Sequence, residues 1–275
     1  MKKNTTKNEP YASQAVLRAL RLLEALNRAV DPQPLQTLCD LLKLPKASAF
    51  RLVRTLEEAG YVVKDPAGGY CSVAQQGLQH SCYRTLLPEA AGATMLGLRR
   101  RFRETVSLAA LFDNHIEVVE VFESPEFIRM SNTVGRILPP HASSLGKAIT
   151  AFQTEQRRER LVRSYGIYGY TSKTITDEPE LQREFDKILS QGHALDAEEN
   201  VEHGYCIGVP LRDTAGATFA ALSVSMPISR RRSDKEQKRM IVEITEAAAE
   251  IVKTFGAAVE SERHLDRRPE PSISR

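Results

Sequence analysis

The chain has neither the long apolar runs of membrane proteins nor the cysteine patterns of secreted ones. None of its 275 residues lies in an apolar run long enough to span a bilayer. Residues 1–10 are polar, without the hydrophobic core of a secretory signal. The four cysteines lack the CxxC spacing of structural zinc sites. We therefore expect a protein of the reducing cytoplasm, with no membrane partner.

The sequence also lacks the glycine-rich phosphate loop and the nucleophile elbow of common enzyme families. With 41% hydrophobic and 27% charged residues, its composition is that of a globular protein long enough for two domains. The net charge of +3 is unevenly distributed, because residues 1–80 hold eleven Lys and Arg against seven Asp and Glu. A basic N-terminal part favours attraction to nucleic-acid phosphates.

Residues 34–73 carry the pattern of a winged helix-turn-helix. Apolar residues fall on one helical stripe at Ala49, Leu52, Val53 and Leu56. Pro45 suits the start of that helix, and Gly60 suits its C-terminal cap. Strand-like residues 61–63 and 70–73 flank the turn sequence DPAGG, which predicts a hairpin wing. Two helices followed by a wing are typical of a DNA-binding head.

Six residues of this head are predicted to contact DNA, five on the second helix and one on the wing: Lys46, Ala47, Ser48, Arg51, Arg54 and Lys64. Arginine binds guanine bidentately or a phosphate, so Arg51 and Arg54 are predicted to make base or near-base contacts. Lys46 and Ser48 are predicted to hold phosphates, with Lys64 assisting from the wing. The alternative is a helical hairpin whose arginines are only solvated.

The remainder is predicted to form a helical linker and an antiparallel α+β body. The predicted division is a disordered N-terminus (1–12), the head (13–74), the linker (75–102), the body (103–256) and a flexible tail (257–275). The linker is interrupted near Pro88, and a first helix at 13–28 uses Ser13 as its cap, with Val16 and Leu20 among the residues facing a core. Strands are expected at 105–112, 116–122, 205–211 and 217–226, an extended segment at 127–133, and helices at 141–152, 177–191 and 233–255.

Four stretches resemble, in order, signatures of the IclR family of bacterial transcriptional regulators. They are LPKASAFRLVRTLEEAGYV, LPPHASSLGKAITAF, TSKTITDEPELQREFDKILSQGHALDAEENVEHGYCIGVPLRD and AALSVSMPISR. The resemblance covers nearly all of residues 13–255. It implies a winged helix-turn-helix joined by the linker to a GAF-like effector-binding domain, in a homodimer or homotetramer that binds double-stranded operator DNA.

The resemblance also implies a small-molecule site between the central sheet and the helix that starts after His141. Position by position, the effector-binding residues are Ser144 and Leu145 through their backbone amides, with Asp196, Cys206, Ser223 and Ser225. Strand alternation puts Ser223 and Ser225 on one face, and amides at a helix N-terminus suit an anion. A small carboxylic acid is the predicted effector, and no cofactor is expected. The alternative is that the serines only satisfy backbone groups.

These features predict a non-enzymatic, ligand-responsive DNA-binding regulator, a repressor that senses a small organic acid and controls a catabolic or transport operon. Two rival interpretations use the same part of the chain. In one, Cys206 is a nucleophile assisted by His203 and Asp196, although residues three apart on a strand point to opposite faces. In the other, His193 and His203 join Asp196 and Cys206 as metal ligands, because all four are zinc-compatible residue types.

Overall fold

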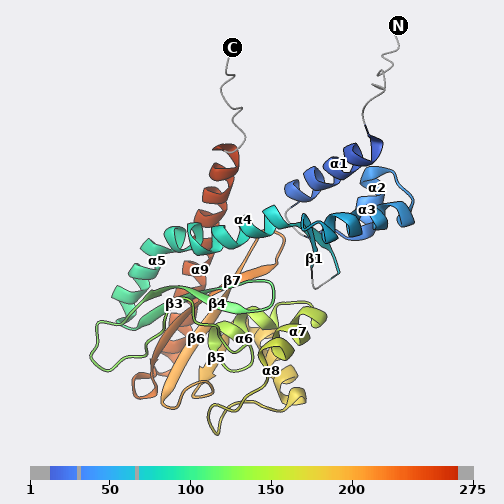
Figure 1. Ribbon diagram of the computed structural model, residues 1–275. Helices are drawn as coiled ribbons and strands as arrows, with labels where there is room; N and C mark the ends of the chain where they lie inside the picture. The colour runs from blue at the N-terminus through green and yellow to red at the C-terminus, as the bar shows by residue number, and fades with distance from the viewer. Residues whose placement is uncertain (1–12, 30–31, 66–67, 266–275) are drawn as a thin grey trace. The chain divides into compact units, whose positions relative to one another are not determined.

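The computed structural model describes residues 13–29, 32–65 and 68–265. The chain divides into two compact units, Met1–His80 and Ser81–Arg275 (Figure 1). Across the described residues, no helix combines the length with the apolar character that crossing a bilayer requires.

The first unit is the predicted winged helix-turn-helix. Its elements are α1 (Gln14–Arg28), α2 (Leu35–Leu42), α3 (Lys46–Glu58) and the antiparallel hairpin of β1 (Val62–Lys64) and β2 (Tyr70–Ser72). Gly60 has φ +78°, so it ends α3 in the left-handed conformation that a glycine adopts without strain. Two residues of the predicted turn, 66 and 67, lie outside the described residues, as do residues 1–12 of the predicted disordered N-terminus.

The core of this unit is a single cluster from all three helices and the hairpin: Leu22, Leu26, Leu38, Val53, Leu56, Val62 and Tyr70. The prediction that Val16 and Leu20 face this core is wrong, because their exposed fractions are 55% and 51%. At about 100° per residue, Val16 lies about 100° and Leu20 about 140° around α1 from the line of Leu22 and Leu26. A helix packed along that line leaves them in solvent.

The predicted linker forms two helices, α4 (Val73–Arg84) and α5 (Leu86–Phe102). The interruption falls at Thr85, just before Pro88. Pro88 itself lies in the first turn of α5, where its missing amide proton leaves no hydrogen bond unmade.

The second unit is built on a five-stranded antiparallel sheet with the strand order β4-β3-β7-β6-β5. Four strands confirm the predicted ones to within two residues: β3 (Thr105–Leu111), β4 (Ile116–Phe122), β6 (Gly204–Arg212) and β7 (Thr218–Pro227). The edge strand β5 (Ala194–Ala197) was not predicted. Its four residues are too few to show an alternation in the sequence.

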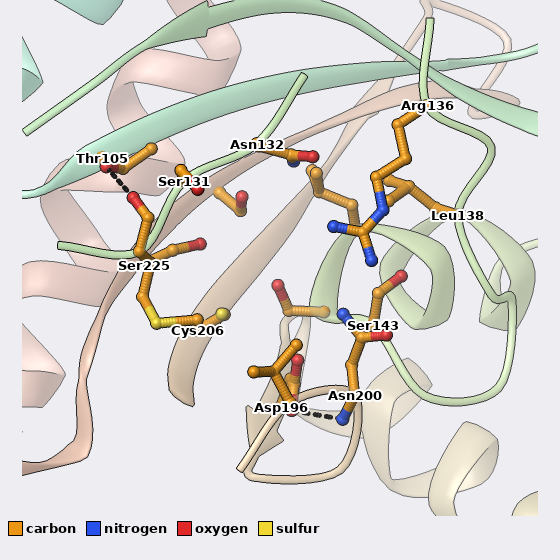
Figure 2. Close-up of a pocket in the computed structure, with 15 residues that line it drawn as sticks. Thr105, Ser131, Asn132, Arg136, Leu138, Ser143, Asp196, Asn200, Cys206 and Ser225 are labelled. Atoms are coloured by element: carbon orange, nitrogen blue, oxygen red, sulfur yellow. Dashed lines mark hydrogen bonds between the residues drawn. The ribbon is translucent and has the colours of Figure 1, made fainter. Parts of the chain in front are cut away.

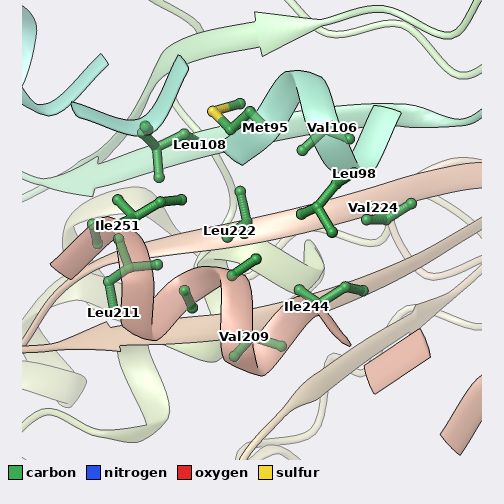
Figure 3. Close-up of a cluster of buried hydrophobic side chains, with 14 of the residues drawn as sticks. Met95, Leu98, Val106, Leu108, Val209, Leu211, Leu222, Val224, Ile244 and Ile251 are labelled. Carbon is green, nitrogen blue, oxygen red and sulfur yellow. The ribbon is translucent and has the colours of Figure 1, made fainter. Parts of the chain in front are cut away.

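Helices cover both faces of this sheet (Figure 1). On one face lie α5 and α9 (Asp234–Leu265), which is preceded by the short 3-10 turn Ile228–Arg230. Figure 3 shows Met95 and Leu98 of α5, with Ile244 and Ile251 of α9, packed against apolar side chains of β3, β6 and β7. The other face carries α6 (Ser144–Ala151), α7 (Glu155–Tyr165) and α8 (Glu178–Gln191) over a second apolar cluster.

Two further segments differ from the sequence prediction. Residues 127–133 form no strand, and the segment joins the sheet only further on, through a bridge between Glu117 and Ile137. Phe127 and Ile128 are 97% and 69% exposed, so no packed partner holds these residues in an extended ladder. Helix α7 was missed because Leu161 is its one buried residue, which leaves little apolar periodicity to recognise.

The closing helix α9 continues to Leu265, whereas the sequence predicted its end at Phe255 and a flexible tail from residue 257. Gly256 lies inside the helix, where one glycine costs only about 1 kcal/mol relative to alanine. Beyond it, the partly buried Val259 packs against the apolar cluster of α5 and α9. That packing carries the helix past the glycine.

Candidate functional site

The six predicted DNA-contacting residues lie on the solvent side of the first unit. Lys46, Ala47, Arg51 and Arg54 on α3 and Lys64 at the end of β1 are exposed, and Ser48 is partly buried. The buried side of α3 is made by Ala49, Val53 and Leu56. The structure therefore presents one polar face of α3 to solvent, beside the hairpin that carries Lys64. The contacts with DNA stay a prediction.

The two arginines of α3 differ in their surroundings. Nη1 of Arg54 lies 2.9 Å from Glu57 Oε2, and its Nη2 lies 3.7 Å from Glu58 Oε1. Within the described residues, the Arg51 side chain has no such acidic partner. Exposed pairs of this kind contribute only about 0.3–0.5 kcal/mol, so Arg54 can leave its partners. The neighbouring carboxylates nevertheless repel DNA phosphates, which makes Arg51 the better placed of the two.

The second unit contains a cavity between the sheet and the N-terminal end of α6; the space between its lining side chains is about 460 Å³ when the solvent at its open mouth is included (Figure 2). All six residues predicted to bind an effector line it: Ser144, Leu145, Asp196, Cys206, Ser223 and Ser225. The fold thus brings together residues that are far apart in sequence. Effector binding by these residues stays a prediction.

Strand register explains why four polar residues share one face of the cavity. Thr105 of β3 pairs with Ser225 of β7, Ser225 with Cys206 of β6, and Cys206 with Asp196 of β5. Paired residues of an antiparallel sheet point to the same side, so the four form a row across the strands. Their neighbours along β3 and β7, such as Val106 and Val224, point into the opposite apolar cluster.

The N-terminus of α6 supplies hydrogen-bond donors to this cavity. The Ser143 side chain caps the helix by accepting from the Gly146 amide at 3.0 Å. Within the described residues, the amides of Ser144 and Leu145 donate to no protein acceptor. A Cβ atom on Gly208 would lie 2.4 Å from the Ser144 carbonyl oxygen, so only glycine at that point of β6 lets the helix end approach the sheet so closely. Two amides without partners at a helix N-terminus suit an anion.

Asp196 provides the negative charge of the cavity. Its side chain is 3% exposed, and Oδ1 accepts hydrogen bonds from the Glu199 amide at 2.9 Å and the Asn200 amide at 3.2 Å. Burial raises the pKa of Asp196 to about 6, although both amides and Lys147 act in the opposite direction. The carboxylate is therefore mostly ionised at neutral pH and costly to leave without donors.

The interpretation of Cys206 as a nucleophile finds no support in this geometry. Burial, followed by the charge of Asp196, raises the pKa of the Cys206 thiol, whereas a reactive cysteine needs its pKa lowered. The His203 side chain is 85% exposed, and its Nδ1 lies 3.7 Å from a Glu198 oxygen. With φ +62°, His203 stands in the turn before β6 rather than beside the thiol.

The two candidate metal ligands, His193 and His203, do not come together with Asp196 and Cys206. Nδ1 of His193 lies 3.1 Å from the Gln191 carbonyl oxygen, and burial lowers the pKa of this histidine. In the part of the chain that the structure describes, no three His, Cys, Asp or Glu residues gather in a way that could hold a metal ion.

Beneath the cavity lies a fully buried lysine that the sequence analysis did not single out. Nζ of Lys147 on α6 lies 2.6 Å from both carboxylate oxygens of Glu199 and 3.2 Å from Oε1 of Glu184 on α8. Burial raises the pKa of Glu199 to about 7, against the lowering effect of Lys147. The ion pair ties the loop after β5 to α6. A lysine within the apolar run Leu145–Ala151 was the signal that could have revealed it.

Further cavity-lining residues were also missed. They are Thr105, Met130, Ser131, Asn132, Arg136, Leu138, Ser143, Asn200 and Val201. Met130, Ser131 and Asn132 come from the segment that was predicted to be extended. Thr105 and Ser143 stand at the ends of predicted elements, and only the register across β3 and β7 reveals that Thr105 belongs to the row of Asp196.

Two family models match the chain, one for each unit. The IclR helix-turn-helix domain matches residues 15–66, and the bacterial transcriptional regulator IclR C-terminal domain matches residues 79–253. The chain is 31% identical to the HTH-type transcriptional repressor AllR of Salmonella typhi, over 82% of this chain and 86% of that protein. For AllR of Escherichia coli K12 the identity is 29% with the same coverage.

Solved structures share the fold at lower identity. The IclR protein of Thermotoga maritima superposes with a TM-score of 0.59 at 23% identity, covering 88% of this chain and 98% of that one. An IclR homologue of Microbacterium hydrocarbonoxydans, solved in complex with 4-hydroxybenzoate, gives a TM-score of 0.57 at 24% identity, covering 88% and 99%. The chain therefore belongs to the IclR family, and it is a DNA-binding transcriptional regulator whose C-terminal unit contains a polar cavity.

Proposed function

We propose that this regulator is a repressor whose affinity for its operator is controlled by a small organic acid bound in the cavity beside α6. The genes that it controls encode the catabolism or uptake of that acid or of its precursors. The name of the 31% identical relative, a transcriptional repressor, supports repression rather than activation. The 4-hydroxybenzoate complex of a structural neighbour supports an organic acid as the ligand class.

One observation carries the ligand side of the proposal. The cavity joins two amides without protein acceptors, at Ser144 and Leu145, to a row of hydroxyl and thiol groups that ends at Asp196. A helix N-terminus carries a partial positive charge, so an anion is stabilised there. The hydroxyl groups fix the orientation of a polar ligand without adding charge.

We further propose that the regulator acts on DNA as a homodimer or homotetramer in the cytoplasm. The support is an exposed apolar stripe on α1, where Val16, Leu17 and Leu20 are 55%, 37% and 51% exposed. A second copy that covers this stripe would present two α3 helices to successive major grooves. The acid then controls binding only if it has unequal affinity for the two arrangements of the heads.

A mobility-shift titration with the upstream region of the gene tests this function. The full-length protein should retard the fragment at low ionic strength, and the correct acid should shift the midpoint. Arg51→Ala should weaken operator binding by about 1–3 kcal/mol while leaving acid binding unchanged. Arg183→Ala, an exposed arginine of the second unit, is the matched control and should bind as the wild type. Failure to retard any upstream fragment, with or without acids, would refute the DNA-binding role at this locus.

A further inference from the structure

Arg136 enters the cavity from a segment that joins the edge of the sheet. The Val118 amide donates to the Arg136 carbonyl at 3.0 Å, and the Leu138 amide donates to the Ile116 carbonyl at 2.9 Å. Successive residues of an extended segment point to opposite sides. Leu138 is buried and lines the cavity whereas Ile137 is 49% exposed, so Arg136 shares the cavity side with Leu138.

The guanidinium of Arg136 is available to a ligand. Figure 2 shows it directed toward the interior of the cavity, above Ser143 at the start of α6. Within the described residues, its side chain makes no hydrogen bond or ion pair, and its one electrostatic neighbour is the Tyr170 hydroxyl. The side chain is exposed, so an entering anion meets it before reaching the buried floor.

The charges that line the cavity decide which acid fits. Of the described lining residues, Arg136 alone is cationic and Asp196 alone is acidic. The N-terminus of α6 adds roughly half a positive charge on the side of Arg136. The negative charge of one ligand carboxylate is therefore neutralised by the Arg136 guanidinium and the two α6 amides. A second carboxylate would have to lie against Asp196, with no further cation in the lining.

The floor of the cavity presents the carboxylate of Asp196, a hydrogen-bond acceptor, so it favours a ligand that carries a hydrogen-bond donor. Ionised Asp196 accepts hydrogen bonds and donates none, and Cys206 and Ser225 stand beside it in the same row. A ligand hydroxyl satisfies this carboxylate without adding charge. An ammonium would also donate to Asp196, and the comparison of lactate with alanine below distinguishes the two donors.

We propose that Arg136 determines the specificity of the site, and that the effector is a small hydroxy monocarboxylic acid. Its carboxylate lies between the Arg136 guanidinium and the amides of Ser144 and Leu145, and its hydroxyl donates to Asp196. This inference rests on the proposed function, because it assumes that an acid occupies this cavity. It names the charge and the donor group that the cavity selects.

Titration calorimetry of the full-length protein with matched acids tests the proposal. A three-carbon set compares lactate with propionate, tartronate and alanine, which respectively lack the hydroxyl, add a carboxylate and replace the hydroxyl by an ammonium. A larger set compares 4-hydroxybenzoate with benzoate and terephthalate. In at least one set, the hydroxy monocarboxylate should bind more tightly than every other member of its set. Arg136→Gln should weaken that binding at least about tenfold, because a hydrogen bond to a charged group is lost.

Arg129→Gln is the matched control, because Arg129 lies in the same segment but pairs with Glu123 and does not line the cavity. It should bind the acid as the wild type does. Equal affinity of Arg136→Gln and wild type for the acid would overturn the role of Arg136 while leaving the proposed function intact. The ligand class would be overturned if the hydroxy monocarboxylate were the tightest binder in neither set, whether it is a compound without the hydroxyl, with a second carboxylate or with an ammonium that binds more tightly. No binding of any compound, with operator binding retained in the mobility shift, would overturn this inference and the effector part of the proposed function, but not the regulator itself.

Discussion

Replacing Lys147 with methionine removes the buried cation that holds the loop after β5. Methionine has a similar length, so the change deletes the charge with little loss of volume. Removing one partner of a buried ion pair typically costs about 3–5 kcal/mol. Glu199 and Glu184 keep 12% and 13% side-chain exposure, so water can reach them in part and the lower end of that range applies. We expect a loss of about 3 kcal/mol in the free energy of unfolding of the second unit.

The cost should depend on pH. The folded-state pKa of Glu199 is about 7, above its ordinary value of 4.5, so below pH 5 the carboxyl is neutral and needs no cation. Without Lys147 that pKa rises further, because the lysine acts to lower it. The difference between wild type and Lys147→Met should therefore be small at pH 5 and should grow as the pH rises through 7.

Scanning calorimetry of the full-length protein at pH 5 and pH 8 measures this difference. In a Glu199→Gln background the cost of Lys147→Met should shrink, because Glu184 can then turn to Lys187, whose Nζ lies 3.4 Å away. Lys173→Met is the control: this lysine is 58% exposed and pairs with Glu198 in the same loop, so its loss should cost less than about 1 kcal/mol. A cost below about 1 kcal/mol for Lys147→Met at pH 8, or an equal cost in the Glu199→Gln background, would refute the reasoning.

Gly208→Ala places a Cβ atom 2.4 Å from the Ser144 carbonyl oxygen, so it should lower the melting temperature and weaken acid binding, whereas Gly92→Ala, with open space around it, should do neither. The folded pKa of Asp196 is about 6, above the ordinary 3.8, so the folded state binds the extra proton and this contribution to stability falls as the pH rises from about 4 to 6. Urea unfolding across that range should show a shallower fall for Asp196→Asn. Leu20→Asp should shift the protein toward monomers in sedimentation analysis and weaken operator binding; an unchanged mass would show that the α1 stripe is not the dimer contact.

Local patterns in the sequence predicted those parts of the fold whose periodicity is strong. The alternation around Ser223 and Ser225 gave the correct face of β7, and glycine at 60 marked the end of α3. The stripe on α1 was read too widely, because periodicity reveals an apolar sector but not which part of it a neighbouring helix covers. In the structure the neighbouring elements cover only the side of α1 that carries Leu22 and Leu26, so Val16 and Leu20 are exposed to solvent.

Only part of the cavity lining could be predicted, because the remaining residues reach it through contacts between elements that are distant in sequence. Asp196, Cys206 and Ser225 were reached through the family resemblance, and the register of three strands explains their meeting. Arg136 and Lys147 owe their positions to contacts between distant elements, the bridge beside β4 and the carboxylates of α8 and the loop after β5. No local pattern encodes such pairings, so a single sequence cannot supply them.

The cavity has two kinds of wall, and this bears on how the regulator can diversify. One wall is the strand row, which is part of the folded sheet. The other includes Met130, Ser131, Asn132 and Arg136, and within the described chain no residue from 127 to 137 belongs to either apolar cluster of this unit. Substitutions of these four residues change what the site recognises with little cost to folding, whereas Gly135 between them has φ +87° and must stay glycine. Laboratory evolution of this protein into a sensor for a new metabolite should therefore randomise Met130, Ser131, Asn132 and Arg136 first.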